Sequence, residues 1–270
     1  MPHAHLRTIA VASLLIALAA SGCTSGDGGD GDRVGSHEPS RAANDDPGVD
    51  STRAARPAKP DHDGIPLRTP DDAHPVVWVR VHEQVRLRTQ PGGGELVDKV
   101  GRHTQWGSVS AFGVVRKSGN WAAVTTPVLP NGRLAWVRLR SDWLRGGWTK
   151  ISVVVDVSDR RGVLLRAGDP ALTFPVTVGM PGADTPTGRF AVTDTFRGDI
   201  NPVYGCCAVA LSATQPHLPS GWLGGKRIAI HGTYSTLGVA ASHGCVRAAD
   251  DVVSELVDRV PLGAPVFIRA

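Results

Sequence analysis

The sequence Ser242-His243-Gly244-Cys245-Val246-Arg247 lies near the C-terminal end of this 270-residue chain, and His231-Gly232-Thr233 precedes it. The histidine at 231 and the cysteine at 245 stand 14 positions apart, and each has a glycine beside it. Glycine lets two backbones approach without a Cβ clash. A free thiol titrates near pH ~8.5 and needs a base or a positive neighbourhood to react at neutral pH. The pattern predicts acyl transfer through a thioester on Cys245, with His231 as the base.

The residues around this pair add to the prediction. The apolar stretch Ile228-Ala229-Ile230 reads as a strand that would hold the ring of His231 still. The backbone amides of His243, Gly244 and Cys245 are candidate donors to a developing oxyanion, which is usually the largest contribution in acyl transfer. On the residues alone, a core histidine and a buried thiol are the alternative interpretation.

Working outward, short apolar or alternating stretches separated by Gly, Pro and Asn turns begin at His74 and continue to the end of the chain. Six of the seven tryptophans lie between Trp78 and Trp148, which gives a small β domain enough apolar area for a core. Strands are expected in this part at 76–81, 84–88, 97–100, 108–115, 121–125 and 134–138. A second all-strand region follows, with strands expected at 151–157, 162–166, 172–178, 188–195, 207–212, 227–231 and 265–269.

One helix is expected in the second region. Asp250 is a good N-cap residue, and large apolar residues between Val252 and Val260 recur on one helical stripe. Pro261 and Gly263 end the pattern. The predicted fold class is mainly β: a small β-barrel domain at 74–147, followed by a β-rich domain at 148–270 with one short helix.

The first 22 residues have the form of a lipoprotein-type secretory signal. An apolar run over 9–20 follows Arg7, and Ala20-Ser21-Gly22-Cys23 closes it. Cys23 would carry the lipid, which places the protein on the outer face of a bacterial cell membrane; an ordinary cleaved signal is the alternative. Residues 23–73 are rich in Gly, Asp, Pro and Ser, and this composition predicts a disordered tether.

Charge and cysteine content narrow the function classes. Residues 74–148 carry 11 Lys and Arg against 4 Asp and Glu, which suits either anionic wall polymers or a solvated basic face. The chain lacks the basic and aromatic interleaving that nucleic-acid binding requires. The Cys and His spacings fit no zinc pattern, and neither a metal nor a cofactor is expected. For Cys206 and Cys207, a buried pair, a vicinal disulfide and a redox gate on Cys245 are all open.

The motifs Thr185-Pro186-Thr187-Gly188 and Tyr204-Gly205 precede the blocks at 231–233 and 242–247. In this order they resemble the L,D-transpeptidases, bacterial wall enzymes with a sandwich-like β catalytic domain, over roughly residues 149–269. The resemblance implies that Cys245 is the nucleophile and that residues 243–245 supply the oxyanion amides. It also implies that His231 is the general base and that the carbonyl of Gly232 orients it. Residues 74–147 resemble the small wall-associated barrels of the bacterial Src-homology-three-like type.

Four residues near the motifs have further candidate roles. Arg247 either pairs with a substrate carboxylate or bridges to the acidic pair at 250–251. Tyr204 either lines the donor groove or fills the core. Thr233 is expected beside the substrate, and Ser242 is expected to brace the turn by hydrogen bonds.

The resemblance also implies a reaction. The thiolate attacks the carbonyl that joins the third residue of a peptidoglycan stem tetrapeptide to its terminal D-alanine, and D-alanine leaves. An amine on another stem then attacks the thioester and forms a cross-link between third residues. Carbapenems are expected to inhibit by acylating the thiol. An L,D-carboxypeptidase, which uses water as the acceptor, and a non-enzymatic wall-binding lipoprotein are the alternatives.

Overall fold

A computed structural model describes residues 67, 69–80, 84–140, 142–198, 200–220 and 225–270. All of them belong to one compact unit, Pro57–Ala270. The expected signal at 1–22, the lipidation site Cys23 and nearly all of the tether lie outside the described residues. No helix within the described part is long and apolar enough to cross a membrane.

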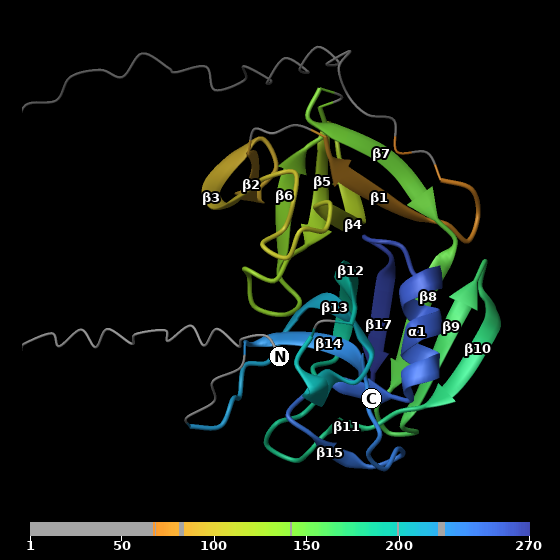
Figure 1. The fold of residues 1–270 in the computed structure, drawn as a ribbon. Coiled ribbons are helices and arrows are strands. Elements are labelled where there is room, and N and C mark those ends of the chain that lie inside the picture. Colours follow the sequence, from red (N-terminus) through yellow and green to blue (C-terminus); the bar gives the residue numbers. More distant parts are fainter. Residues whose placement is uncertain (1–66, 68, 81–83, 141, 199, 221–224) are drawn as a thin grey trace, which may run out of the picture. The chain divides into compact units, whose positions relative to one another are not determined.

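Seven strands form an antiparallel sheet in the N-terminal part of this unit (Figure 1). Their order across the sheet is β3-β2-β6-β5-β4-β1-β7, so that β3 and β7 are its edges. A core of alternating apolar side chains, among them Val77, Leu87 and Val137, is fully buried behind it. The strands are β1 (His74–Val79), β2 (Val85–Gln90), β3 (Gly93–Val100), β4 (Ala111–Ser118), β5 (Trp121–Thr125), β6 (Leu134–Arg138) and β7 (Leu144–Thr149).

Strand β7 is absent from the sequence prediction. Its centre is Gly146-Gly147, and it pairs with β1 along six residues. A Cβ on Gly147 would lie 2.8 Å from the ring of Trp78, so the small residue is required by close packing and not by a turn. The sheet therefore runs to Thr149, past the expected boundary at 147. The division into domains and the likeness of this sheet to a Src-homology-three-like barrel remain predictions.

The C-terminal part contains an eight-stranded mixed sheet with the order β10-β9-β8-β17-β12-β13-β14-β16. Most pairs are antiparallel, but β17 pairs with β8 and β14 pairs with β16 in parallel. The strands are β8 (Ile151–Asp156), β9 (Arg161–Arg166), β10 (Asp169–Pro175), β12 (Gly188–Arg197), β13 (Cys207–Thr214), β14 (Arg227–Gly232), β16 (Val246–Ala248) and β17 (Pro265–Arg269). The short strands β11 (Val178–Gly179) and β15 (Ala240–Ser242) pair separately in parallel.

The predicted fold class, mainly β with a single helix, is confirmed for the described residues. The helix α1 (Asp250–Arg259) packs against β12, β13 and β14 and buries Val253 and Leu256. Its first turn carries two acidic side chains and its last turn carries Arg259, as the helix dipole favours. A short 3₁₀ helix, Pro202–Tyr204, precedes β13.

The predicted N-cap is wrong by one residue. Ala249 occupies the N-cap position and makes no side-chain cap, whereas Asp250 is the first helical residue. The carboxylate of Asp250 lies against the backbone of Gly205 and Gly232, where a Cβ on either glycine would approach it within 2.3 Å. The side chain is therefore directed towards the neighbouring loops instead of the start of its own helix.

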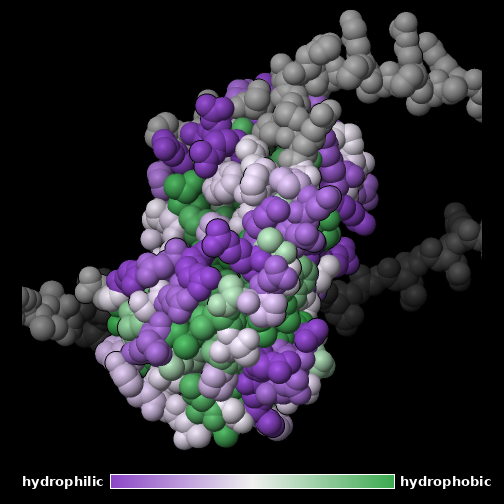
Figure 2. Space-filling view, turned by 90° about the vertical axis from the view of Figure 1, so that its right-hand side faces the viewer, coloured by the Kyte–Doolittle hydropathy of each residue, from purple (hydrophilic) through white to green (hydrophobic). Residues whose placement is uncertain are grey.

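Two loops of the N-terminal part contact strands of the C-terminal sheet through side-chain hydrogen bonds. The Thr104 hydroxyl donates to the Asp194 carboxylate of β12, and the Asn131 amide nitrogen donates to the Thr214 carbonyl of β13 at 2.6 Å. On the face drawn in Figure 2, hydrophobic residues gather in the lower half and hydrophilic residues border them. These hydrogen bonds hold β12 and β13 against the N-terminal part. Strands β14 and β16 follow β13 at the end of the same sheet.

Candidate active site

Strand β14 and the turn before β16 bring His231 and Cys245 to one place. The parallel pairing sets Ile230 opposite Val246 and His231 opposite Arg247. Cys245 comes directly before β16, which is the neighbour of β14 in the sheet, so its side chain lies next to β14. Both His231 and Cys245 line the same cavity of about 70 Å³. The two side chains that the sequence singled out thus share one site.

Cys245 is the free cysteine among the described residues. Its Sγ lies 4.0 Å from the carbonyl oxygen of Arg227 on β14. Burial raises the pKa of the Cys245 thiol above its usual value, while a hydrogen bond from the Ala229 backbone and the charge of Arg247 act in the opposite direction. Burial is the larger effect, so the resting thiol is protonated and needs a base.

The ring of His231 is buried and fixed on two sides. Its Nδ1 lies 2.8 Å from the carbonyl oxygen of Gly232, and the ring of Tyr204 packs edge-on at 5.0 Å between centroids. A carbonyl can only accept, so Nδ1 carries the hydrogen and Nε2 of the neutral ring is an acceptor. Burial lowers the pKa of His231, with the Gly232 carbonyl opposing and the Arg247 charge reinforcing the effect. A neutral imidazole and a neutral thiol in one cavity have the protonation states that a general base and its nucleophile would need.

Ser242 holds the turn that carries Cys245. This fully buried side chain donates from its Oγ to the Cys245 carbonyl and accepts from the Gly244 amide at 3.1 Å. The second bond bears on the expected oxyanion site, because the Gly244 amide would have to release Ser242 before it could donate to a substrate. The roles of the Cys245 and His243 amides stay predictions.

The sequence analysis missed two residues that brace this turn from outside. The buried Thr185 hydroxyl donates to the Gly244 carbonyl at 2.9 Å and accepts from Gly179 at 2.8 Å. The buried Gln215 amide nitrogen donates to the His243 carbonyl at 3.1 Å. Thr185 lies in a motif that was noted without a role, whereas nothing local in the sequence marks Gln215.

Gln215 also explains why residue 244 is a glycine. Gly244 has φ +107°, and a Cβ there would lie 2.2 Å from the Gln215 amide nitrogen. Both the backbone conformation and the space at this position exclude a side chain. The glycine therefore makes a tight turn against a buried amide.

The remaining predicted residues divide into two groups. Tyr204 and Arg247 line the cavity with the reacting pair. Arg247 makes no ion pair with Asp250 or Asp251 within the described residues, and its buried Nε has no hydrogen-bond partner there. Thr233 is not part of the cavity lining, and its hydroxyl accepts from the Ser235 amide at 3.1 Å instead.

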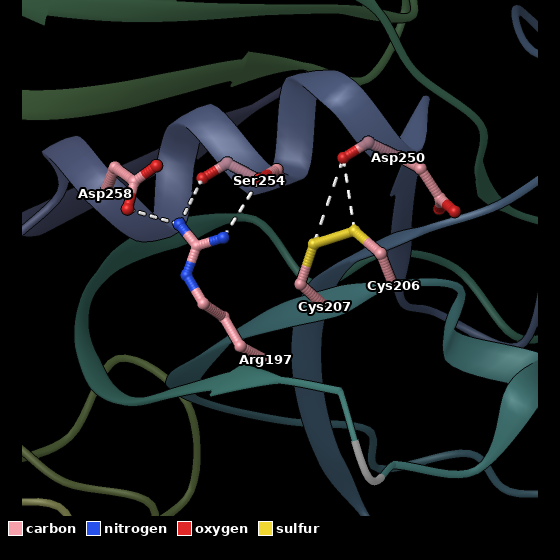
Figure 3. Close-up of polar contacts among 6 residues, drawn as sticks. All are labelled: Arg197, Cys206, Cys207, Asp250, Ser254 and Asp258. Carbon is pink, nitrogen blue, oxygen red and sulfur yellow. Dashed lines mark hydrogen bonds and ion pairs between the residues drawn. A yellow bond between two sulfur atoms is a disulfide. The ribbon is translucent and has the colours of Figure 1, made fainter.

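Cys206 and Cys207 form a vicinal disulfide, one of the alternatives that the sequence left open. The two sulfurs lie 3.2 and 3.8 Å from the backbone carbonyl of Asp250 at the start of α1, while the carboxylate of Asp250 points away from them (Figure 3). The next residue in β13, Ala208, pairs with His231. The disulfide therefore lies between the start of α1 and the part of β13 that pairs with His231.

A second contact holds α1 further along. The Arg197 guanidinium, at the end of β12, donates to the hydroxyl and the carbonyl of Ser254, both at 3.0 Å, and forms an ion pair with Asp258 (Figure 3). No group of three or more His, Cys, Asp or Glu side chains among the described residues is placed to hold a metal ion.

The comparison with known families agrees with this geometry. Residues 150–268 match the family described as L,D-transpeptidase catalytic domain (YkuD). The C-terminal part of the chain is therefore similar to L,D-transpeptidase catalytic domains. Every residue that lines the cavity, from Val203 to Arg247, falls inside the matched segment.

Individual relatives cover only part of the chain. The curated protein "Probable L,D-transpeptidase ErfK/SrfK" of Salmonella typhimurium is 30% identical over 135 residues, which is 43% of each of the two chains. The chain thus spans less than half the length of the curated relative that it matches. Solved L,D-transpeptidases include one from Mycobacterium tuberculosis H37Rv, at 16% identity, TM-score 0.37 and coverage of 51% of this chain and 73% of that one. Another, a mutant from Enterococcus faecium, has 21% identity, TM-score 0.35 and coverage of 44% and 49%.

Proposed function

We propose that this protein is a peptidoglycan L,D-transpeptidase that uses Cys245 as its nucleophile and His231 as its general base. The observation that carries the proposal is that these two side chains line one cavity in a domain of that family. The protonation states support it, because burial raises the pKa of the Cys245 thiol and lowers that of the His231 imidazole.

In the first step, Nε2 of His231 takes the proton from the Cys245 sulfur as the sulfur attacks. The attacked carbonyl joins the third residue of the stem tetrapeptide to D-alanine. The C–N bond breaks, and the imidazolium returns its proton to the leaving amine of D-alanine. The acyl group stays on the sulfur as a thioester, which keeps the energy of the cleaved amide without a cofactor.

The negative charge that develops on the attacked oxygen needs hydrogen-bond donors. The backbone amides of Cys245 and His243 are the candidates, since the Gly244 amide donates to Ser242. The Gln215 and Thr185 side chains hold the carbonyls of His243 and Gly244 and so fix the peptide planes of the turn. Donors placed in advance cost no reorganisation in the transition state.

In the second step, the side-chain amine of a diamino acid on another stem attacks the thioester. Neutral His231 accepts the amine proton, and the thiol is regenerated with a cross-link between third residues. The half-buried guanidinium of Arg247 in the cavity wall would attract the carboxylate of the terminal D-alanine. If water replaced the amine, the same residues would perform L,D-carboxypeptidase hydrolysis.

Incubation with a disaccharide-tetrapeptide and analysis of the products by mass tests the proposal. A cross-linked dimer that has lost one D-alanine supports transfer, and a free tripeptide alone would establish hydrolysis. Cys245→Ala is expected to abolish both products. Full activity in that variant would show that the chemistry lies elsewhere in the chain, and a wild-type protein without either product would leave only a wall-binding role.

The cellular setting belongs to the same proposal. Lipidation at Cys23 would anchor the protein to the outer face of the cell membrane, and residues 24–73 would let the catalytic domain reach the wall. Metabolic labelling with a fatty acid, compared between wild type and Cys23→Ser, tests the anchor. Carbapenem inhibition follows from the same thiol, because an acylating β-lactam would form an adduct on Cys245.

A further inference from the structure

A second and larger cavity lies beside the site. It has a volume of about 390 Å³ and is lined by residues 98–101, 103–106, 110–112 and 125–128 of the N-terminal part, together with Thr193, Asp194 and Arg227 of β12 and β14. This volume falls within the range of small-molecule sites in proteins. Arg227 lines both this cavity and the one that holds Cys245.

Three side chains in the wall of this cavity have an unused hydrogen-bonding atom. Ser110 Oγ, Thr125 Oγ1 and Asp194 Oδ2 are buried, and none of them has a partner among the described residues. The other carboxylate oxygen of Asp194 accepts from the Thr104 hydroxyl. A buried polar group without a partner is unfavourable, so these atoms would gain from a ligand that can donate or accept a hydrogen bond. Small rotations about Cα–Cβ would turn the two hydroxyls to a ligand that offers several hydroxyl or amide groups.

The charges of the cavity cancel. Asp98 and Asp194 are opposed by Lys99 and Arg227. The Arg227 guanidinium already donates to the Thr193 hydroxyl at 2.8 Å and to the Leu211 carbonyl at 3.3 Å. A lining without net charge gives no long-range attraction to either a polyanion or a cation. It favours an uncharged ligand.

Trp106 adds an aromatic surface. Its residue is 43% exposed, although the ring of Phe196 packs edge-on at 5.7 Å and the Arg227 guanidinium lies 5.1 Å from its centroid. These contacts hold the indole in place and leave part of it open to the cavity. An indole offers a large rigid apolar surface. The C–H face of a pyranose ring is flat and apolar while its edge carries hydroxyls, and this combination matches Trp106 and the polar walls.

We propose that this cavity binds an uncharged saccharide unit, of the kind that forms the glycan strands of the bacterial wall. The assignment of the saccharide to wall glycan rests on the proposed function, whereas the match of cavity and sugar rests on the cavity alone. The site holds the glycan of a substrate while its stem peptide reaches Cys245. Arg227 lies between the saccharide cavity and the cavity of Cys245, because its guanidinium packs on Trp106 and its carbonyl oxygen lies 4.0 Å from the Cys245 sulfur.

Isothermal titration of N,N′-diacetylchitobiose into the full chain carrying Cys245→Ala tests the site without any reaction. Saturable binding is expected, and Trp106→Ala is expected to weaken it at least tenfold, which corresponds to about 1.4 kcal/mol. Trp148→Ala is the matched control, since Trp148 is 48% exposed but does not line the cavity, and its affinity should equal that of the parent.

Ser110→Ala gives a second readout that does not depend on Trp106. The variant removes a buried hydroxyl without a partner, so the protein should unfold at the same temperature or higher while its affinity for the saccharide falls. The absence of saturable binding, or equal affinity of the parent and Trp106→Ala for the saccharide, would each overturn the proposal.

The outcome is separable from that of the proposed function. With active protein, Trp106→Ala should lower kcat/KM for a disaccharide-tetrapeptide at least tenfold and leave kcat/KM for the sugar-free tetrapeptide unchanged. Loss of both in equal measure would indicate a damaged catalytic site and count against a saccharide subsite. A protein that binds the saccharide but releases no D-alanine would refute the transpeptidase and retain the subsite.

Discussion

The Nδ1 atom of His231 lies 2.8 Å from the carbonyl oxygen of Gly232, the next residue in the chain. In the proposed mechanism, this short backbone contact would take the orienting role that a carboxylate has in many catalytic triads. Asp250 packs its carboxylate against the other side of Gly232, and its charge raises the pKa of His231. Burial and the charge of Arg247 lower that pKa, so the pKa of His231 results from opposing effects.

Asp250→Asn is expected to move the acid limb of the kcat/KM profile to lower pH. The negative charge favours imidazolium, so its removal lowers the pKa of His231 and leaves more neutral base at any given pH. Arg247 and Tyr204, which also act on the pKa of His231, are unchanged in this variant. The measurement is the pH dependence of D-alanine release.

Asp251→Asn is the matched control for this prediction, because Asp251 is exposed in the same helical turn and carries the same charge. Its acid limb should coincide with that of the wild type. Equal displacement in both variants would attribute the effect to the general charge of the helix start.

Gly244→Ala is expected to lose nearly all transfer activity and to lower the free energy of unfolding by roughly 2–4 kcal/mol, from the left-handed backbone and overpacking together. The new Cβ would lie 2.2 Å from the Gln215 amide nitrogen. Gly238→Ala, with φ +78° and no atom within 4 Å of the added Cβ, carries the backbone cost alone. Urea denaturation should rank the two; equal losses would contradict the role of Gln215.

Thr185→Val is expected to reduce activity more than stability. It leaves the Gly179 amide and the Gly244 carbonyl without their partner, at a cost of about 1–3 kcal/mol, and frees the turn that carries Cys245. Thr187→Val, two positions along and exposed, should behave as wild type in both assays. An active Thr185→Val protein would show that the turn keeps its shape without this brace.

Replacement of the disulfide by Cys206→Ser/Cys207→Ser is expected to cost little global stability, on the order of 1 kcal/mol, because a link between neighbours closes almost no loop. Local effects should be larger, since Tyr204 and Ala208 flank the pair and both meet His231. We expect a several-fold fall in kcat/KM with a nearly unchanged unfolding midpoint. A large fall in the midpoint with normal kcat/KM would contradict this division.

The parts of the fold that sequence could predict are those with local signals. The alternating strands of both sheets, the helix and the His231 and Cys245 blocks have such signals. The strands β11, β15 and β16 have only two or three residues each and exist because distant segments pair, so no periodicity marks them. Strand β7 was not expected either, because glycine is uncommon in strands and the room that Gly147 leaves for Trp78 is a tertiary contact.

The candidate site shows the same limit. The amide of Gly244 looked like an oxyanion donor because the motif gives its position but not its partner, and the partner is the Ser242 hydroxyl. Gln215 lies 30 residues before Cys245 and is brought to the turn by the β13–β14 connection. The cavity beside Trp106 depends on contacts between two sheets, which no segment of the sequence encodes alone.

The rate at which a carbapenem acylates Cys245, followed by intact mass across a range of pH, tests the pairing of His231 and Cys245 most directly. In the wild type the rate should rise as His231 loses its proton, and the adduct should map to Cys245. His231→Gln should remove that rise and slow acylation near neutral pH by at least a hundredfold, while His217→Gln, an exposed histidine, should react as wild type. Equal acylation rates in wild type and His231→Gln, or an adduct on another residue, would contradict the account.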